Sequence, residues 1–370
     1  MSQVKFIGVD KRMAGLSGPQ GDPHNDMKTI TVTMMVVDDN GAPASLPVKV
    51  TSGRSEGSVL FFDSDFQPLY PGGDADPWIH VESWKNGEVL LYLCAPMPII
   101  FNLIAVVEKP PSGTNQTTLV FFDFDANLAN PPFPLPGLAL PGGQFDIPPW
   151  SKLSYGTSAN VQVTPQMVQF RTAATVCNTE LLNTGGPELL NSNFVVPYQA
   201  LLTGGRLNQL AYLLDNGVNA FTSPTLRFPA FGQALVMPDP YKSAQYPAPQ
   251  WPYGTVTRLT TSDIWPGMTL TLTLVDGVQQ GDTYDIYLYL NGYDKYGNFI
   301  PAAPPHVYTI TAPAGAKPNQ TVSYTISKED LLGYGRKNAY EWGYMWADCL
   351  INRSAWTFPW GPIMIDFTYP

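Results

Sequence analysis

The stretch MTLTLTLVDGVQQGDTYDIYLYL, residues 268–290, decides the fold class of this chain. From Met268 to Val275 polar and apolar residues alternate, and this period of two is typical of a β-strand with one buried face. Asp276 and Gly277 form a turn dipeptide, after which Thr283–Leu290 alternates again. The segment therefore predicts a strand, a turn and a returning strand.

The composition of the whole chain supports a β-rich protein. Among 370 residues there are 37 Pro and 32 Gly, while charged residues make up 14% and aromatic residues 12%. Proline at this frequency is incompatible with long helices, because each one removes a backbone donor and clashes with the preceding turn. The low charge and the many aromatic residues exclude a disordered chain. The length predicts two or three domains.

The N-terminal region repeats the pattern of strand and turn. Thr29–Val37 alternates, Asp38–Gly41 contains an Asn-Gly turn, and further short strands extend to Val107, which fits a β-sandwich. Two proline-rich stretches follow, Asn130–Gly143 and Pro238–Pro252. Consecutive prolines favour the polyproline conformation, so we expect stiff extended linkers there.

An internal repeat relates the middle of the chain to its C-terminal part. The sequences NSNFVVPYQALLTGGRLNQLAY (191–212) and TVSYTISKEDLLGYGRKNAYEW (321–342) align without gaps. Identical residues stand at five aligned positions: Leu201 and Leu331, Leu202 and Leu332, Gly205 and Gly335, Arg206 and Arg336, and Asn208 and Asn338. The pattern predicts a strand, a one-turn helical crossing plugged by the Leu pair, a glycine turn and another strand. Ser327 is the predicted N-cap of the second crossing.

These segments resemble a known group of bacterial repeats. WPGMTLTLTLVDG (265–277) followed by VSYTIS (322–327) and a short crossing is similar to bacterial immunoglobulin-like repeats. TVTMMVVDDNGAP (31–43) followed by LPVKVTSG (46–53) resembles the invasin-type variant. The resemblance implies tandem domains without catalytic residues, which serve in adhesion, spacing or recognition.

Together these signals predict an all-β chain of tandem Ig-like β-sandwich domains joined by Pro-rich linkers. The expected domains are residues 1–112, an invasin-type sandwich, residues 113–238, a sandwich with a Pro-rich entry, and residues 239–370, a repeat of the middle domain.

Charge and targeting signals limit the partners and the compartment. The formal net charge is −10 and the 20 basic residues are scattered, which disfavours nucleic acid and anionic membranes as partners. The N-terminus lacks the apolar segment of a secretory signal, and no apolar run is long enough to span a membrane. We expect cytoplasmic synthesis, non-classical export to the cell surface or extracellular space, and three buried, reduced cysteines.

Motifs of catalysis are missing from the sequence. Its three histidines, His24, His80 and His306, lie far apart, and no zinc, nucleophile-elbow or phosphate-loop pattern is found. We therefore expect no enzymatic activity and no cofactor, with Ca²⁺ as the one alternative.

The Ca²⁺ alternative rests on paired aspartates. Two similar segments, residues 59–78 and 119–134, place three Asp-x-Asp pairs beside strands, and alternate residues of a strand share a face. The candidate metal ligands are Asp63, Asp65, Asp74, Asp76, Asp123 and Asp125. The competing interpretation is that aspartates at strand ends accept hydrogen bonds from turn amides.

Aromatic residues give the candidate binding surface. Ile286, Leu288 and Leu290 share one face of a strand, so the intervening tyrosines face the other way and form a flat surface suited to sugar or protein recognition. The candidate ligand-binding residues are Tyr287, Tyr289, Tyr293, Trp346 and Trp356. The competing interpretation assigns these rings to the core and to strand propensity.

The resulting hypothesis is a non-enzymatic bacterial binding protein, an adhesin or a lectin-like module. Its expected partner is a glycan or a host surface protein, and homo-oligomerisation stays open. Two alternatives remain: a secreted toxin component, insecticidal or pore-forming, and a structural spacer of a fibre or particle.

Overall fold

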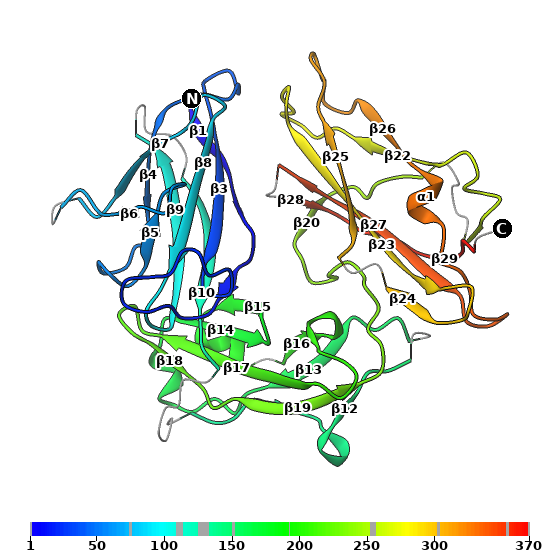
Figure 1. The fold of residues 1–370 in the computed structure, drawn as a ribbon, viewed down its shortest axis with the longest axis horizontal. Coiled ribbons are helices and arrows are strands. Elements are labelled where there is room, and N and C mark those ends of the chain that lie inside the picture. The colour runs from blue at the N-terminus through cyan, green and yellow to red at the C-terminus, as the bar shows by residue number, and fades with distance from the viewer. Residues whose placement is uncertain are drawn as a thin grey trace. The chain divides into compact units, whose positions relative to one another are not determined.

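The computed structural model describes residues 2–73, 76–108, 114–124, 133–149, 152–191, 193–251, 257–301, 304–352 and 355–368. Within it the chain forms two compact units (Figure 1). Unit 1 contains Met1–Pro148 and Gly156–Gln233, and unit 2 contains Pro149–Tyr155 and Ala234–Pro370. The described elements are almost all strands, which confirms the all-β prediction.

Unit 1 begins with a sandwich of two five-stranded sheets. One sheet has the order β1 (Gln3–Val9), β3 (Ile30–Val37), β8 (Glu88–Cys94), β5 (Leu60–Phe62) and β6 (Pro68–Leu69). The other has the order β2 (Met13–Ala14), β10 (Asn115–Phe121), β9 (Ile99–Val107), β4 (Pro47–Thr51) and β7 (Ile79–Glu82). Alternate residues of the central strands, such as Val32 and Met34 of β3, are fully buried between the sheets.

A second sandwich completes unit 1. A three-stranded sheet contains β11 (Gly137–Leu138), β13 (Gly156–Asn160) and β16 (Phe194–Pro197). The facing sheet contains β12 (Phe145–Asp146), β19 (Leu226–Phe231), β17 (Leu207–Asp215), β14 (Thr172–Cys177) and β15 (Glu180–Gly185), with β18 (Ala220–Thr222) paired to β17. Short 3₁₀ turns connect these strands: η1 (Pro141–Gly143), η3 (Met167–Gln169), η4 (Pro187–Leu190) and η5 (Tyr198–Ala200).

One apolar cluster joins the two sandwiches of unit 1. It combines residues of β2, β9 and β10, and Phe122 directly after β10, with residues of β14 and β17: Met13, Ile100, Val120, Phe122, Ala174, Val176, Ala211 and Leu213. The predicted boundary between residues 112 and 113 lies outside the described residues. The predicted boundary between residues 238 and 239 lies close to the division between Gln233 and Ala234.

Unit 2 is a third sandwich. Its large sheet contains β20 (Ala244–Tyr246), β28 (Ala355–Thr357), β27 (Gly343–Ile351), β23 (Thr283–Tyr293) and β24 (Phe299–Pro301), with β25 (His306–Thr311), β29 (Trp360–Asp366) and β21 (Arg258–Thr260) paired beside them. The facing sheet has β22 (Met268–Thr273) and β26 (Thr321–Ile326). In Figure 1 these strands are coloured from yellow-green through orange to red.

The turn at Asp276–Gly277 does not form a hairpin, contrary to the sequence expectation. β22 pairs with β26, and β23 pairs with β25 and β27, so the chain crosses here from one sheet to the other. Leu270 and Leu272 of β22 are buried in the same core cluster as Ile286 of β23. The two apolar faces oppose each other across the core, and strands in that arrangement cannot pair side by side.

One sheet of each sandwich has the same strand order. The last strand of each (β10, β19, β29) pairs antiparallel with a long preceding strand (β9, β17, β27) and parallel with a short early strand (β2, β12, β21). This order with two facing sheets is that of tandem Ig-like sandwiches, and it confirms the predicted fold class.

The internal repeat corresponds to matching elements of the second and third sandwiches. η5 follows β16, an edge strand of the small sheet, and precedes the long strand β17; α1 (Lys328–Leu331) likewise follows β26 and precedes β27. Leu201, directly after η5, and Leu331, within α1, are both buried. Ser327 caps α1 by accepting a hydrogen bond from Asp330 N at 3.3 Å, as predicted. No described helix is long and apolar enough to cross a membrane.

The paired glycines and asparagines of the repeat have different roles. Gly205 has φ of 77°, whereas Gly335 has no left-handed φ and instead packs closely against Thr368. Asn208 is buried and hydrogen-bonds to the backbone of Leu202, while the side-chain oxygen of Asn338 accepts from amides of an exposed loop. The repeat therefore preserves topology more strictly than side-chain function.

Candidate functional site

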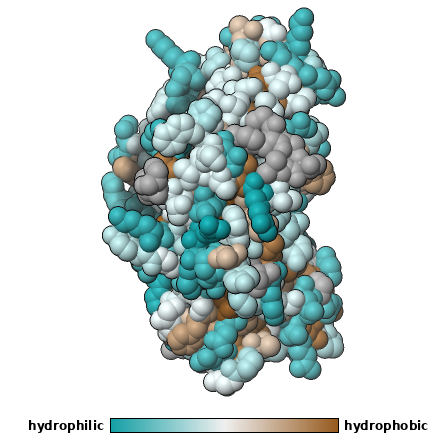
Figure 2. All heavy atoms as spheres, turned by 90° about the vertical axis from the view of Figure 1, so that its right-hand side faces the viewer, coloured by the Kyte–Doolittle hydropathy of each residue, from teal (hydrophilic) through white to brown (hydrophobic). Residues whose placement is uncertain are grey.

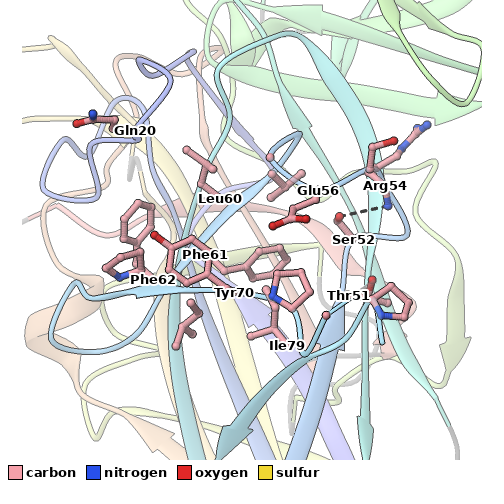
Figure 3. Close-up of a pocket in the computed structure, with 18 of the residues that line it drawn as sticks. Gln20, Thr51, Ser52, Arg54, Glu56, Leu60, Phe61, Phe62, Tyr70 and Ile79 are labelled. Carbon is pink, nitrogen blue, oxygen red and sulfur yellow. Dashed lines mark hydrogen bonds between the residues drawn. The ribbon is translucent and has the colours of Figure 1, made fainter. Parts of the chain in front are cut away.

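A cavity of about 800 Å³ lies in the first sandwich of unit 1. It lies between the loop that follows β4 and the strands β5 and β6 (Figure 3). Phe61, Phe62 and Tyr70 are on one side of the space, and Thr51 and Ser52 are on the other. Pockets of this size bind small molecules, which makes this cavity the candidate site.

The polar side of the pocket is a loop whose shape depends on hydroxyl and glycine residues. Thr51 Oγ1 accepts from Gly53 N at 3.1 Å, and Ser52 Oγ accepts from Arg54 N at 3.3 Å. Gly53 adopts φ of 61°, in the left-handed region where side chains are disfavoured. The loop carries Glu56 over the pocket (Figure 3).

The aromatic side depends on a turn that Asp63 organises. Asp63 Oδ1 accepts from Asp65 N at 2.9 Å and from Gln67 N at 2.8 Å, which reverses the chain between β5 and β6. Phe61 is buried at the base of the pocket, whereas Tyr70 is 71% exposed at its rim. A largely exposed ring beside a cavity offers a flat apolar face and a hydroxyl to a ligand.

Arg54 anchors the polar loop from behind. In Figure 3 its side chain points away from the pocket. Its guanidinium donates to the carbonyl of Ile100 and lies 3.0 Å from Asp215 Oδ1 in the second sandwich. The side chains of Arg54 and Asp215 are only 13% and 1% exposed. The guanidinium of Arg54 is therefore already neutralised by a buried partner. Because breaking this pair would leave an uncompensated buried charge, Arg54 holds the loop in place.

The remaining pocket groups can form hydrogen bonds. Gln20, Ser52, Glu56 and Tyr70 supply amide, hydroxyl and carboxylate groups around an apolar base. No histidine lines the pocket among the described residues, so its hydroxyls have no adjacent imidazole to act as a base. The arrangement can bind a polyhydroxylated ligand with an apolar ring face.

His80 forms a separate polar group on β7. Its Nε2 lies 2.7 Å from Asp76 Oδ2, and its Nδ1 hydrogen-bonds to Glu108 Oε1. These hydrogen bonds, to Asp76 first and then to Glu108, raise the pKa of His80. The contact with His80 correspondingly lowers the pKa of Asp76. The side chain of His80 is nearly half exposed, so solvent screens these charges.

The candidate metal ligands do not converge where they are described. Asp63 serves its turn, the Asp65 side chain is in an exposed position, and Asp76 contacts His80. Asp123 follows β10, while Asp74 and Asp125 lie outside the described residues. Within the described ranges no group of three or more His, Cys, Asp or Glu side chains could hold a metal ion. The Ca²⁺ hypothesis stays a prediction.

Four of the five candidate aromatic residues meet on one face of the large sheet of unit 2. Tyr289 pairs with Trp346 between β23 and β27, and the Tyr287 and Trp356 ring centroids lie 5.1 Å apart. Tyr289 and Trp346 are buried, because residues 235–242 cross this face; this segment is called the strap. The side chain of Asn291 makes two hydrogen bonds to the backbone of Val236: Oδ1 accepts from Val236 N and Nδ2 donates to Val236 O, each at 2.7 Å.

A buried ion pair fastens the strap. Lys242 Nζ contacts Asp348 Oδ2 and lies 3.8 Å from the centroid of the Trp356 ring. Tyr289 OH donates to Asp348 Oδ1 at 3.3 Å. Burial lowers the pKa of Lys242 to about 8. The face expected to meet a ligand is thus occupied by the chain's own segment; Tyr287 and Trp356 are half-buried at its edge.

Tyr293, the fifth candidate, lies apart from the strap at the end of β23. Its ring is buried, and Lys337 Nζ lies 5.7 Å from the ring centroid. Burial, with a smaller effect of Glu341, raises the pKa of Tyr293 to about 12. The ligand-binding assignment of the five aromatic residues stays a prediction.

Sequence reasoning did not identify the pocket or the strap. A signal for the strap was present in β27, where Asp348 interrupts an apolar run, since a buried carboxylate requires a cation. For the pocket, the dense Gly, Ser and Pro residues around Tyr70 indicated loops but not that they enclose a cavity.

The comparisons with known proteins give no family. No family model matches the chain, and no curated protein matches its sequence. Among solved structures the chain is similar to the D0-D1 domain of intimin, with 11% identity and a TM-score of 0.25 over 61% of this chain and 98% of that one. It is also similar to invasin, a bacterial integrin-binding protein, with 13% identity and a TM-score of 0.21.

That likeness covers 98% of this chain and 60% of the invasin chain, so the chain spans less than two thirds of that structure. A C-terminal intimin fragment in complex with the intimin-binding domain of the translocated intimin receptor has 14% identity and a TM-score of 0.20, over 61% of this chain and 64% of the fragment. At these values the likenesses assign no function, and the Ig-like fold follows from the strand order alone.

Proposed function

We propose that the protein is a non-enzymatic recognition protein that binds an uncharged glycan in the pocket of the first sandwich. The observation that carries the proposal is the pairing of Tyr70, exposed at the rim, with a polar loop across a cavity of about 800 Å³. A sugar has the matching chemistry, because its ring carries an apolar C–H face and hydroxyl groups around the edge.

The charge balance of the pocket favours an uncharged sugar. Arg54 is held by Asp215, so the polar groups left to face a ligand include the neutral Gln20, Ser52 and Tyr70, and the charged one is the carboxylate of Glu56. A carboxylate accepts hydrogen bonds from sugar hydroxyls, whereas it repels an anionic sugar. We therefore place a neutral hexose-type unit against Tyr70 with its hydroxyls toward Glu56.

A glycan array of the full chain tests this proposal. We expect wild-type protein to bind a set of neutral glycans, and Tyr70→Ala to lose that binding while Tyr241→Ala retains it. Tyr241 is the matched control, since its ring is 70% exposed in unit 2. Absence of binding to every neutral glycan, or equal binding by Tyr70→Ala, would contradict the proposal. A repeat with EDTA tests the Ca²⁺ hypothesis on the same array.

The biological setting is part of the same proposal. A glycan ligand would be carried by a host or neighbouring cell surface, which suits an adhesin-like role after non-classical export. Nothing in the described pocket favours the toxin or the spacer alternative over this role.

A further inference from the structure

Two loops of unit 2 lie side by side at one end of the third sandwich. Residues 294–298 follow β23, and residues 334–342 precede β27. Tyr293 N donates to Gly335 O and Gly335 N donates to Tyr293 O, each at 2.9 Å. These paired hydrogen bonds fix the two loops against each other.

Each loop is shaped by one side-chain acceptor. Asp294 Oδ1 accepts from Tyr296 N and from Asn298 N, both at 2.8 Å. Asn338 Oδ1 accepts from Tyr340 N at 2.8 Å and from Glu341 N at 3.0 Å. The turns point two tyrosines into solvent: Tyr296 is 77% exposed and Tyr340 is 94% exposed.

Four cations contact aromatic rings in or beside the two loops, and these cations together with Tyr296 and Tyr340 are called the cationic tip. The guanidinium carbons of Arg258 and Arg336 lie 5.0 and 5.2 Å from the ring centroid of Trp342. Lys295 Nζ lies 5.1 Å from the ring centroid of Tyr296, and Lys337 Nζ lies over Tyr293. Contacts between cations and ring faces hold the charges in place before a ligand arrives.

The carboxylates near the tip are already engaged. Asp366 pairs with Arg336 at 2.9 Å, Glu341 pairs with Lys337 at 3.2 Å, and Asp294 is occupied by its turn. Arg258 and Lys295 have aromatic rings as their described partners and are therefore available to an incoming anion. Because the whole chain carries a net charge of −10, this local group is a distinct place for an anion to bind.

The exposed side chains of the tip disfavour a protein partner. The centre of a protein interface is rich in apolar contact, but the large apolar side chains exposed in residues 294–298 and 334–342 are the two tyrosines. Flat rings with polar edges beside separated cations match a chain of sugar rings that carries repeated anionic groups. Figure 2 shows hydrophobic colour in small separate spots on the face it presents.

We propose that the cationic tip is a second binding surface, which takes a linear acidic polysaccharide. Tyr340 and Tyr296 lie against sugar ring faces, and Lys295 and Arg258 contact the carboxylate or sulfate groups. The inference concerns residues of unit 2 and an anionic ligand, so it stands or falls independently of the pocket near Tyr70.

The test measures binding of the full chain to immobilised polygalacturonate and to immobilised heparin by biolayer interferometry, with dextran and poly-L-glutamate as comparison probes. Comparing binding to polygalacturonate with binding to heparin distinguishes recognition of carboxylate groups from recognition of sulfate groups. We expect binding at about 50 mM NaCl that is largely lost at about 300 mM, because salt screens exposed charges.

Two single variants locate the surface. Tyr340→Ala should weaken binding roughly five- to tenfold, and Lys295→Gln roughly two- to fivefold. Both side chains are exposed, so neither change disturbs the core. Lys317→Gln is the matched charge control, because Lys317 is exposed in the loop that precedes β26, near the opposite end of β23. Tyr70→Ala should bind as wild type.

Three results would overturn the inference. The first is no binding to either acidic polysaccharide at low salt. The second is binding that Tyr340→Ala and Lys295→Gln weaken no more than Lys317→Gln does. The third is equal or tighter binding to poly-L-glutamate, which would assign the surface to an acidic protein segment instead.

Discussion

Replacing Lys242 by methionine should loosen the strap and destabilise unit 2 by about 3–5 kcal/mol. The side chain of Lys242 is 10% exposed and that of Asp348 is fully buried, so the variant leaves a carboxylate inside the protein without its cation. Tyr289 OH still donates to Asp348, which offsets part of the loss. The contact of Lys242 with the Trp356 ring disappears as well.

Native-state hydrogen exchange measured by mass spectrometry is the suitable assay, because the chain has two units and global unfolding need not be two-state. Protection of peptides from β23 and β27 should fall roughly 100- to 5,000-fold, as a tenfold change corresponds to about 1.4 kcal/mol. Peptides from the first sandwich should keep their protection and serve as the internal control.

A double variant separates the buried charge from simple loss of packing. Lys242→Met combined with Asp348→Leu removes both charges, and replacing a buried ion pair by apolar residues is often neutral. We expect the double variant to recover most of the lost protection. If the single variant keeps wild-type protection, or if the double variant is less protected than the single one, the reasoning about the strap is wrong.

The other predictions concern unit 1. His80→Gln should be less stable than wild type at low pH and nearly equal at high pH in urea unfolding. Because the pKa of His80 is raised in the folded state, His80 stabilises the fold fully below pH 6.5, its ordinary pKa, and this stabilisation is lost as the pH rises through the folded-state pKa. A difference in stability between wild type and His80→Gln that widens with rising pH would contradict this. Gly87→Ala should cost at least about 1 kcal/mol, since Gly87 has φ of 79° and a Cβ there would meet the carbonyl of Val36; an unchanged urea midpoint would refute this. Asp63→Asn, which keeps an oxygen acceptor for the turn, should change stability by no more than about 0.5 kcal/mol with or without Ca²⁺ in thermal melts. A Ca²⁺-dependent loss of stability would instead identify Asp63 as a metal ligand.

Local alternation was enough to predict the fold class but not the pairing of strands. The threonine and leucine pattern of residues 268–275 correctly indicates a strand with one buried face. Whether that strand pairs with its neighbour or faces it across the core depends on contacts with residues more than 40 positions away, such as the pairing of Met268 with Ile326. A local pattern does not encode such partners.

The repeat was predicted because duplication preserves the order of elements. The crossing at α1 and its Ser327 cap are local features, so the sequence indicates them directly. The roles of Gly335 and Asn338 differ from those of Gly205 and Asn208, because these roles depend on the neighbouring strands rather than on the residues themselves.

The aromatic residues show where prediction from periodicity ends. Alternation correctly placed Tyr287 and Tyr289 on the face opposite Ile286 and Leu288. It could not show that the strap covers that face, since the strap is distant in sequence and is held by Asn291 and Lys242. Exposure of Tyr70 and Tyr340 is likewise a property of loop geometry, which composition alone does not determine.

The function proposed for this protein depends on an uncharged glycan binding against Tyr70. Isothermal titration of one array-selected glycan into wild type, Tyr70→Ala and the control Tyr241→Ala tests it most directly. We expect Tyr70→Ala to weaken the affinity about tenfold or more through the loss of ring contact, and Tyr241→Ala to leave it unchanged. Equal affinities for wild type and Tyr70→Ala would show that the glycan does not bind against Tyr70.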